Sequence, residues 1–174
     1  SIEDYQPTVY NDALQYHDNI EAYKQQCQKK IAKLSTIAQI GEEIQSNEFL
    51  PNDMEFYQAK WKKVYDNANV LSGKLGNLIN NWQHYNDQVQ HLEEWIDESN
   101  NHLNEFERKM PSIGFGELEN HLNTMKFFEN EVSCKNADLI SLNQMSEKLC
   151  GYLTPDGACL LKEKLKLVKD QIEI

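Results

Sequence analysis

The chain has 174 residues, a formal net charge of −11 at neutral pH and a pI near 4.9. Nucleic acid and anionic lipid both require a concentrated positive surface, so this charge argues against nucleic-acid and lipid-binding functions. Seven glycines, four prolines and a mean hydropathy of −0.72 indicate a soluble, helix-rich chain. No apolar run approaches the ~18 to 20 residues of a membrane-spanning helix, and no basic region precedes an apolar run at the N-terminus. We therefore expect neither direct membrane insertion of this segment nor secretion.

The first expected helix follows a lead-in of residues 1–8, where Pro7 is unfavourable inside a helix. It begins near Val9 and ends within residues 45–49. Its broad apolar face consists of Leu14, His17, Ile20, Cys27, Ile31, Leu34, Ile37, Gly41 and Ile44. Residues 50–53, Leu-Pro-Asn-Asp, then predict a break and an N-cap for the next helix.

The longest expected helix covers Met54 to Met110 and contains no proline. Its apolar positions recur at alternating steps of three and four, with Ser99 as the single polar member: Met54, Tyr57, Trp61, Val64, Ala68, Leu71, Leu75, Leu78, Trp82, Tyr85, Val89, Leu92, Ile96, Ser99, Leu103, Phe106 and Met110. This spacing averages 3.5 residues, which keeps one stripe facing partner helices in a left-handed bundle. One unbroken helix would extend on the order of 85 Å, too long for one compact domain. We therefore expect it to serve two bundles in turn, with Gly73 and Gly76 inside it.

Two more helices are expected after the long one. Residues 111–116 read as a loop, because they contain one proline and two glycines. An amphipathic helix follows over residues 118–149, and residues 151–157 predict a turn that ends in Pro-Asp-Gly. The last helix covers residues 160–172. All expected elements are helices.

A repeat of about 105 residues relates the two halves of the chain. A shift of about 105 residues superposes the apolar face of the first helix on that of the helix at 118–149. A shift of about 104 superposes the start of the long helix on the last helix. If the helices of one unit are named A, B and C, the chain reads B, C continuing into A, B, then a truncated C.

The second half of the long helix carries the most specific motif. Trp82 and Tyr85 are followed about ten residues later by Leu-Glu-Glu-Trp-Ile-Asp-Glu at residues 92–98. Together with the repeat, this motif resembles helix A of spectrin repeats, and Trp61 with Val64 resembles the early part of their helix C. The resemblance covers nearly the whole chain and implies an all-α fold of tandem, left-handed, three-helix coiled-coil bundles joined by one long continuous helix. It implies a structural core signature of Trp61, Trp82, Tyr85, Leu92, Trp95 and Ile96.

The resemblance also implies a domain division and a function. Residues 1–84 would form a spectrin-like repeat that lacks its first helix, and residues 85–174 a second repeat with a truncated last helix. The chain would be a non-enzymatic, elongated spacer or scaffold segment of a cytoskeletal linker, of the spectrin, dystrophin, plakin or nesprin kind. Such a segment transmits force and sets the distance between end domains. Its location would be cytoplasmic and cytoskeleton-associated, at the nuclear envelope or cell cortex according to the parent protein.

The absent helices leave two explanations open. Either the chain is an excerpt from a longer array, or the open pair of helices accepts a helix from a partner, as at the tetramer junction of spectrin. The partners would be cytoskeletal or adaptor proteins, or a second copy that forms a homodimer by helix exchange. Direct side-binding to actin, which some related rods show, conflicts with the charge of −11, because the actin filament is also acidic.

No group of residues indicates catalysis, a cofactor or a metal. His84 and His91 share one helix side, as do Glu98 and His102, but a transition metal needs at least three convergent ligands. His17 lies on an apolar stripe, where a histidine is packed more often than it acts as a base. The four cysteines form no CxxC pair and predict a reducing compartment.

Two surface features also have ordinary interpretations. The densest groups of lysines are expected to be solvated helix faces: Lys29, Lys30, Lys33, Lys162, Lys164, Lys166 and Lys169. Residues 92–97 faintly resemble the tryptophan-acidic peptides that bind kinesin light chains. We interpret Trp95 instead as a core residue, because the repeat needs it there and a buried tryptophan is inaccessible to a partner.

Overall fold

The computed structural model describes residues 5–44, 51–110 and 114–172, except for the side chains at 42, 44, 51–53 and 115. Within these residues the chain forms four α-helices, one short 3₁₀-helix and no strand, so the fold is all-α. The elements are α1 (Tyr10–Ile44), α2 (Pro51–Lys109), η3 (Phe115–Glu117), α3 (Leu118–Cys150) and α4 (Pro155–Ile172). Each helix interior follows the apolar period of the sequence, and α2 continues through both of its glycines as expected.

The ends of the elements differ from expectation in three places. Residues 51–53 lie inside α2, where a break and cap were expected, and Pro155 begins α4, where the sequence predicts a turn. Proline suits the first position of a helix, because its φ is already helical and its missing N–H would have no partner there. The end of the expected 111–116 loop forms part of η3. The expected end of the first helix, residues 45–49, lies outside the described residues.

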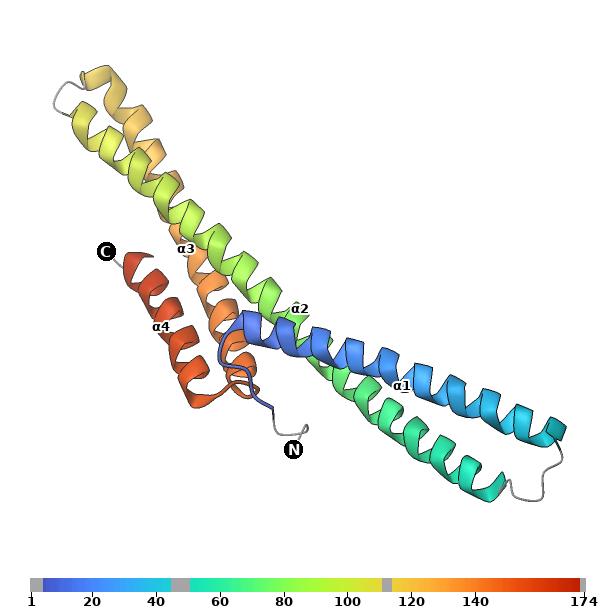
Figure 1. Cartoon of the computed structure of the whole chain (residues 1–174). Coiled ribbons are helices and arrows are strands. Elements are labelled where there is room, and N and C mark those ends of the chain that lie inside the picture. Colours follow the sequence, from blue (N-terminus) through green and yellow to red (C-terminus); the bar gives the residue numbers. More distant parts are fainter. Residues whose placement is uncertain (1–4, 45–50, 111–113, 173–174) are drawn as a thin grey trace. The chain divides into compact units, whose positions relative to one another are not determined.

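The chain divides into two compact units. Unit 1 takes in Ser1–Tyr5 and Val9–Ile79, and unit 2 takes in Gln6–Thr8 and Asn80–Ile174. α2 is therefore common to both units. Figure 1 shows α1 alongside the first half of α2 in unit 1, and α3 and α4 with the second half of α2 in unit 2.

The core of unit 1 lies between α1 and α2. Its buried residues recur at heptad-like spacings on both helices: Ala13, Ile20, Cys27, Ala68, Ser72, Leu75 and Leu78. The Gln28 side-chain amide donates to the Tyr65 hydroxyl (3.0 Å), which joins α1 to α2 on one side of this core. Tyr5 stacks on Tyr16 of α1 with ring centroids 3.8 Å apart.

The core of unit 2 receives side chains from α2, α3 and α4. The buried residues are Trp82, Tyr85, Val89, Leu92, Ile96, Leu142, Ser146, Leu149, Leu153, Leu161, Leu165 and Val168. Leu153 lies in the turn between α3 and α4, and the others lie three, four or seven positions apart on their helices, so each helix presents one stripe to the others.

Candidate functional site: structural anchors and exposed faces

The six residues of the expected core signature have unequal exposure. Trp82, Tyr85, Leu92 and Ile96 are buried on α2 in unit 2. Trp61 in unit 1 and Trp95 in unit 2 are only partly buried. Trp95 contacts α3 through its ring, where Lys135 Nζ stands 5.7 Å from the ring centroid.

Tyr85 is the most enclosed of the signature residues, at 1% exposed. Its hydroxyl donates to the carbonyl oxygen of Leu161 on α4 (3.4 Å). Burial raises the pKa of Tyr85 to about 12, and the nearby Cys150 and Glu93 add to the shift because they would repel a phenolate. Tyr85 thus joins α2 to α4 as a neutral hydrogen-bond donor.

A groove of about 430 Å³ opens beside Trp95. It is lined by α2, α3 and the last turn of α4, chiefly through Trp95, Ile96, Leu103, Met125, Phe128 and Ile172. Further along α2 and α3 several apolar side chains are exposed, namely Leu103, Leu118, Leu122 and Phe127, and Met110, directly after α2, is exposed as well. This part of unit 2 therefore buries less of its apolar stripe than the part around Tyr85.

The segment Gln6–Thr8 packs on the turn between α3 and α4. Pro7 is almost fully buried there, and its carbonyl oxygen accepts a hydrogen bond from the Thr154 backbone N–H (3.1 Å). The hydroxyl oxygens of Thr8 and Thr154 are 2.9 Å apart. Thr154 also caps α4, because its hydroxyl accepts a hydrogen bond from the backbone N–H of Gly157 (3.1 Å).

Sequence reasoning treated residues 1–8 only as a lead-in and missed this contact. Threonine followed by proline is a start signal for a helix, so the cap at Thr154 could have been inferred. The contact of Pro7 with Thr154 could not have been inferred, because no local sequence pattern links residue 7 to residue 154.

A polar cluster interrupts the core of unit 1. Ser72, only 7% exposed, donates from its hydroxyl to the Glu21 carboxylate, which also receives Lys24 Nζ at 2.8 Å. His17 Nε2 lies 3.5 Å from the Ser72 hydroxyl oxygen and 4.0 Å from the Glu21 carboxylate. The hydrogen bonds from Lys24 and Ser72 lower the pKa of Glu21. His17 therefore packs at the boundary of the α1–α2 contact, beside a carboxylate.

The other histidines and the cysteines lie in separate surroundings. His91 Nδ1 is 3.6 Å from Glu94, His102 packs near the Phe128 ring, and His121 packs against Phe106. The structure does not bring together three potential metal-ligating groups anywhere in its described residues. All four cysteines are free thiols, and the Glu163 carboxylate raises the pKa of the exposed Cys159. In the described part of the chain, no helix has the length and apolar character needed to cross a membrane.

Comparison with known proteins gives a relative of much greater length. The chain is 26% identical over 167 residues, or 96% of its length, to the Muscle-specific protein 300 kDa of Drosophila melanogaster. It spans about 1% of that relative's length. No family model and no solved structure matches the chain. The chain is therefore similar, over nearly all its residues, to a small part of a very long muscle-specific protein.

Proposed function

We propose that the chain is a non-enzymatic structural segment of a longer cytoskeletal linker, made of two spectrin-like units that set distance and transmit force. The observation that carries the proposal is α2, a helix of 59 residues that supplies Ala68 and Leu75 to the core of unit 1 and Tyr85 and Ile96 to that of unit 2. Backbone hydrogen bonds that continue through a shared helix oppose bending between the units it joins.

Two further findings support this role. The apolar stripe of α2 has the 3.5-residue period of left-handed bundles on both sides of the unit boundary. The similarity to a far longer muscle-specific protein is what a segment of an extended rod would show. A cytoplasmic location next to the cytoskeleton, with proteins as partners, belongs to the same proposal. The proposed function is non-enzymatic because helix geometry, rather than a reactive side chain, performs it.

Single-molecule energy transfer along α2 tests the spacer function. Dyes would be attached through unnatural amino acids at the exposed positions Glu55 and Glu107, which are 52 residues apart on one helix. At about 1.5 Å per residue, a continuous helix separates them by roughly 78 Å. A narrow distribution of transfer efficiencies near that separation supports the spacer. A broad distribution, or a much shorter separation, would contradict it.

A proline variant provides the matched control. Asn80→Pro places a proline inside α2 at an exposed position beside the unit boundary, where it removes one backbone hydrogen bond and clashes with the preceding turn. The same pair of dyes should then report a broader distribution. If the variant and the parent chain give the same distribution, helix continuity does not set the distance.

A second candidate function is supported by unit 1. Several large apolar side chains are exposed on its two helices, with Phe56 at 62% and Tyr57 at 50%. An open pair of amphipathic helices can accept a third helix, from a partner or from a second copy of this chain. Light scattering over a concentration series tests the second copy: a dimer that grows with concentration supports helix exchange, and a constant monomer mass argues against it.

A further inference from the structure

Three residues ahead of α1 belong to a different unit from the residues on either side of them. Tyr5 and Val9 are part of unit 1, whereas Gln6–Thr8 are part of unit 2. The chain therefore passes between the units at three places, twice around this segment and once within α2, after Ile79. We call Gln6–Thr8 the clasp. The two units thus have a second covalent connection besides α2.

The clasp is bound to the turn between α3 and α4 and to the first turn of α4. Pro7 is almost fully buried, although proline is usually an exposed residue. Its carbonyl oxygen accepts a hydrogen bond from the Thr154 backbone N–H, and the hydroxyl groups of Thr8 and Thr154 are paired. The Thr8 backbone lies against Gly157, where a Cβ would have no room. In Figure 1 the blue segment before α1 runs beside this turn. Unit 2 therefore provides a fitted site for the clasp.

Both ends of the clasp are anchored in unit 1. Before the clasp, the Tyr5 ring stacks on Tyr16 with centroids 3.8 Å apart, and the Tyr5 hydroxyl donates to the carbonyl oxygen of Asp12 (3.1 Å). After the clasp, the Val9 backbone N–H donates to the Asp12 carboxylate (3.2 Å). The clasp is thus a short loop whose middle belongs to unit 2 and whose two flanks belong to unit 1.

The connection from the clasp to α1 has almost no slack. Thr8 contacts unit 2, Val9 is already part of unit 1, and α1 begins one residue later at Tyr10. Two residues of extended chain span at most about 7 Å. While the clasp is bound, α1 cannot begin farther than that from Thr8. Movement of α1 relative to unit 2 is therefore restricted.

The other connection, α2, contains residues at which helices bend easily. Ser72 and Gly73 are adjacent, and Gly76 follows three residues before this part of unit 1 ends at Ile79. Kinks in helices occur at glycine–serine pairs, and domains that share only a small connection move relative to each other by default. A second connection without slack opposes both bending and twisting at such a place.

We propose that the clasp couples the two units and limits the bending of α2 near their boundary. The proposal rests on the spacer function and adds a device that sets the stiffness of the spacer. The clasp is bound by a few contacts at one turn, whereas each unit is held by a core that extends along its helices. It should therefore open before either unit unfolds. Under load, the segment would become more flexible first and lose helical structure only later.

A purely local role for the clasp explains less of its structure. Packing on the turn before α4 would stabilise unit 2, but it would not require the anchors of Tyr5 and Val9 in unit 1. The two roles differ in what they predict. A local role changes the stability of unit 2 alone, whereas a coupling role also changes the motion between the units.

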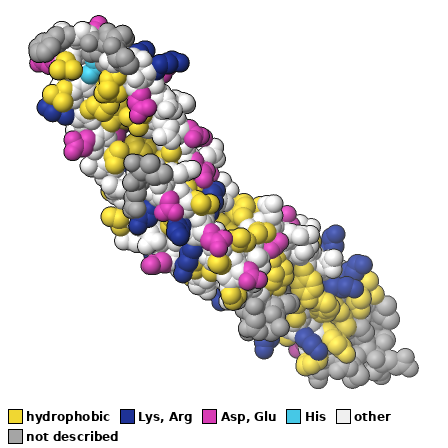
Figure 2. Space-filling model, turned by 90° about the vertical axis from the view of Figure 1, so that its left-hand side faces the viewer, with side chains coloured by type: hydrophobic (Ala, Val, Ile, Leu, Met, Phe, Trp, Pro, Cys, Tyr) yellow, Lys and Arg dark blue, Asp and Glu magenta, His cyan; other side chains and the backbone are white. Residues whose placement is uncertain are grey.

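Pro7→Asp opens the clasp, because a carboxylate cannot be buried at this position without a partner. Hydrogen exchange of the Thr154 amide should accelerate at least about tenfold, since its acceptor is the carbonyl of residue 7. Gln6→Asp is the matched control, because it adds the same charge one residue earlier at an exposed position. Figure 2 shows many exposed acidic side chains on the face in view, and one more should leave this exchange rate unchanged.

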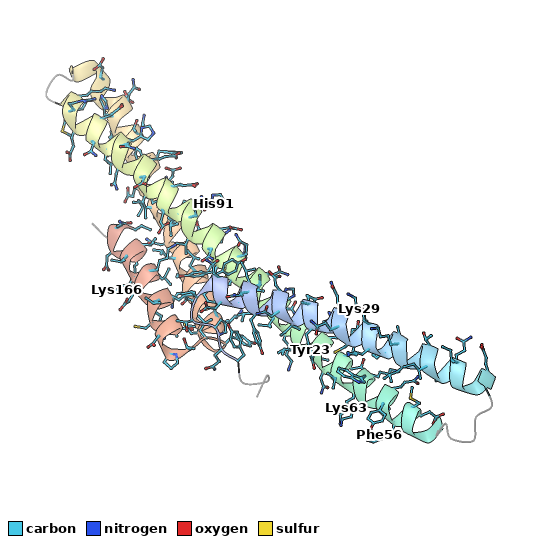
Figure 3. The ribbon with its side chains drawn as sticks, viewed as in Figure 1. Tyr23, Lys29, Phe56, Lys63, His91 and Lys166 are labelled. Carbon is cyan, nitrogen blue, oxygen red and sulfur yellow. The ribbon has the colours of Figure 1, made fainter. Side chains whose placement is uncertain are left out.

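Single-molecule energy transfer between the units measures the coupling. Dyes would be attached through unnatural amino acids at Lys29 of α1 and Lys166 of α4, which are exposed and are labelled in Figure 3. The width of the distribution of transfer efficiencies reports the motion between the units. The parent chain and Gln6→Asp should give equally narrow distributions. Pro7→Asp should widen the distribution at least about twofold, because α2 then connects the units alone.

A second control separates opening of the clasp from loss of stability. Leu165→Ala removes a buried side chain of α4, ten residues beyond the start of that helix, and should destabilise unit 2 without opening the clasp. Urea unfolding measures the stability of each variant, and circular dichroism confirms that each is folded before dyes are attached. The distribution between the dyes should stay narrow in Leu165→Ala.

Four outcomes would overturn the proposal. They are a distribution that is already wide in the parent chain, equal widening in Pro7→Asp and Leu165→Ala, faster Thr154 exchange in Pro7→Asp with a distribution that stays narrow, and unchanged Thr154 exchange in Pro7→Asp. The dye pair along α2 tests the spacer function separately. If the distance along α2 is as expected, the spacer stands even when the clasp fails. A broad distribution along α2 with the expected results for the clasp would contradict the spacer and leave the coupling supported.

Discussion

Gly157 of α4 lies against the backbone of Thr8: a Cβ at position 157 would stand 2.5 Å from the Thr8 carbonyl oxygen and 3.0 Å from its Cα. Real Cβ atoms do not approach backbone this closely, so only glycine fits here while Gln6–Thr8 keeps its place. This glycine is in the first turn of a helix, where alanine would otherwise be favoured. The close approach therefore outweighs helix propensity at this position.

Gly157→Ala should destabilise unit 2 by about 1–3 kcal/mol, because the backbone of Thr8 must move away. The displacement should break the hydrogen bond from the Thr154 N–H to the Pro7 carbonyl, so hydrogen exchange at the Thr154 amide should accelerate. Gly73→Ala is the matched control, since a Cβ at residue 73 meets open space. Unchanged exchange at Thr154 in the Gly157 variant would show that the contact is not maintained in solution.

Thr154→Val should cost about 1 kcal/mol of the stability of unit 2, because the valine keeps the shape of threonine but removes the cap on the Gly157 N–H. It also removes the hydroxyl that pairs with Thr8. Thr154→Ser keeps the hydroxyl and should retain most of the stability. Urea unfolding followed by circular dichroism measures both variants, and a serine variant as unstable as valine would argue against the cap.

The stability of the chain should fall between pH 10 and about 12 through Tyr85. The folded state holds the Tyr85 proton to a pKa of about 12, whereas an unfolded tyrosine loses its proton near pH 10. In that interval the unfolded state binds fewer protons, so the free energy of unfolding decreases as pH rises; the contribution is fully present below pH 10.

Absorbance at 295 nm should show one tyrosine that titrates near pH 12. Tyr85→Phe should remove this step and flatten the loss of stability. At neutral pH the variant should lose only about 0.5–1 kcal/mol, because it gives up one long hydrogen bond to the Leu161 carbonyl. An unchanged titration curve in the variant would mean that another tyrosine is responsible.

Ser72→Ala should raise the pKa of Glu21, because it removes one of the two side-chain hydrogen bonds that favour the carboxylate. The lowered pKa of Glu21 stabilises unit 1 above the pKa of the unfolded state, and this contribution disappears as pH falls through the folded value. Carbon-13 NMR of the side-chain carboxyl measures the titration. Ser35→Ala, in which the exposed serine donates to the Ile31 carbonyl, should leave the Glu21 pKa unchanged.

Gly73→Ala with Gly76→Ala should stabilise α2 by about 1 kcal/mol at each position, since alanine loses less conformational entropy in a helix. Neither Cβ would clash: residue 73 faces open space, and residue 76 would meet only His17 Nε2 at 4.0 Å. Thermal unfolding measures the gain. Under the spacer function, the double variant should also keep any partner binding. If it loses binding instead, flexibility at the glycines is part of recognition.

The structure also shows where sequence reasoning succeeds within the signature. The burial of Tyr85, Leu92 and Ile96 follows from their positions on the apolar stripe of α2. Trp95 lies one residue before Ile96, and its large ring is only partly buried where α2 meets α3. Periodicity indicates which side of a helix a residue occupies, but how much a neighbouring helix covers that residue depends on the path of the neighbour.

The sequence by itself determined the all-α class, the order of the four helices and the continuity of α2. These features depend on local periodicity and on the absence of proline from the interior of α2, which act within a few turns of helix. Only the tertiary structure decided that Pro7 and Thr8 pack on the turn before α4, and that Glu21 and Ser72 share a hydrogen bond inside unit 1. Both contacts join residues far apart in the chain, and a pairing of that kind depends on packing that no local pattern specifies.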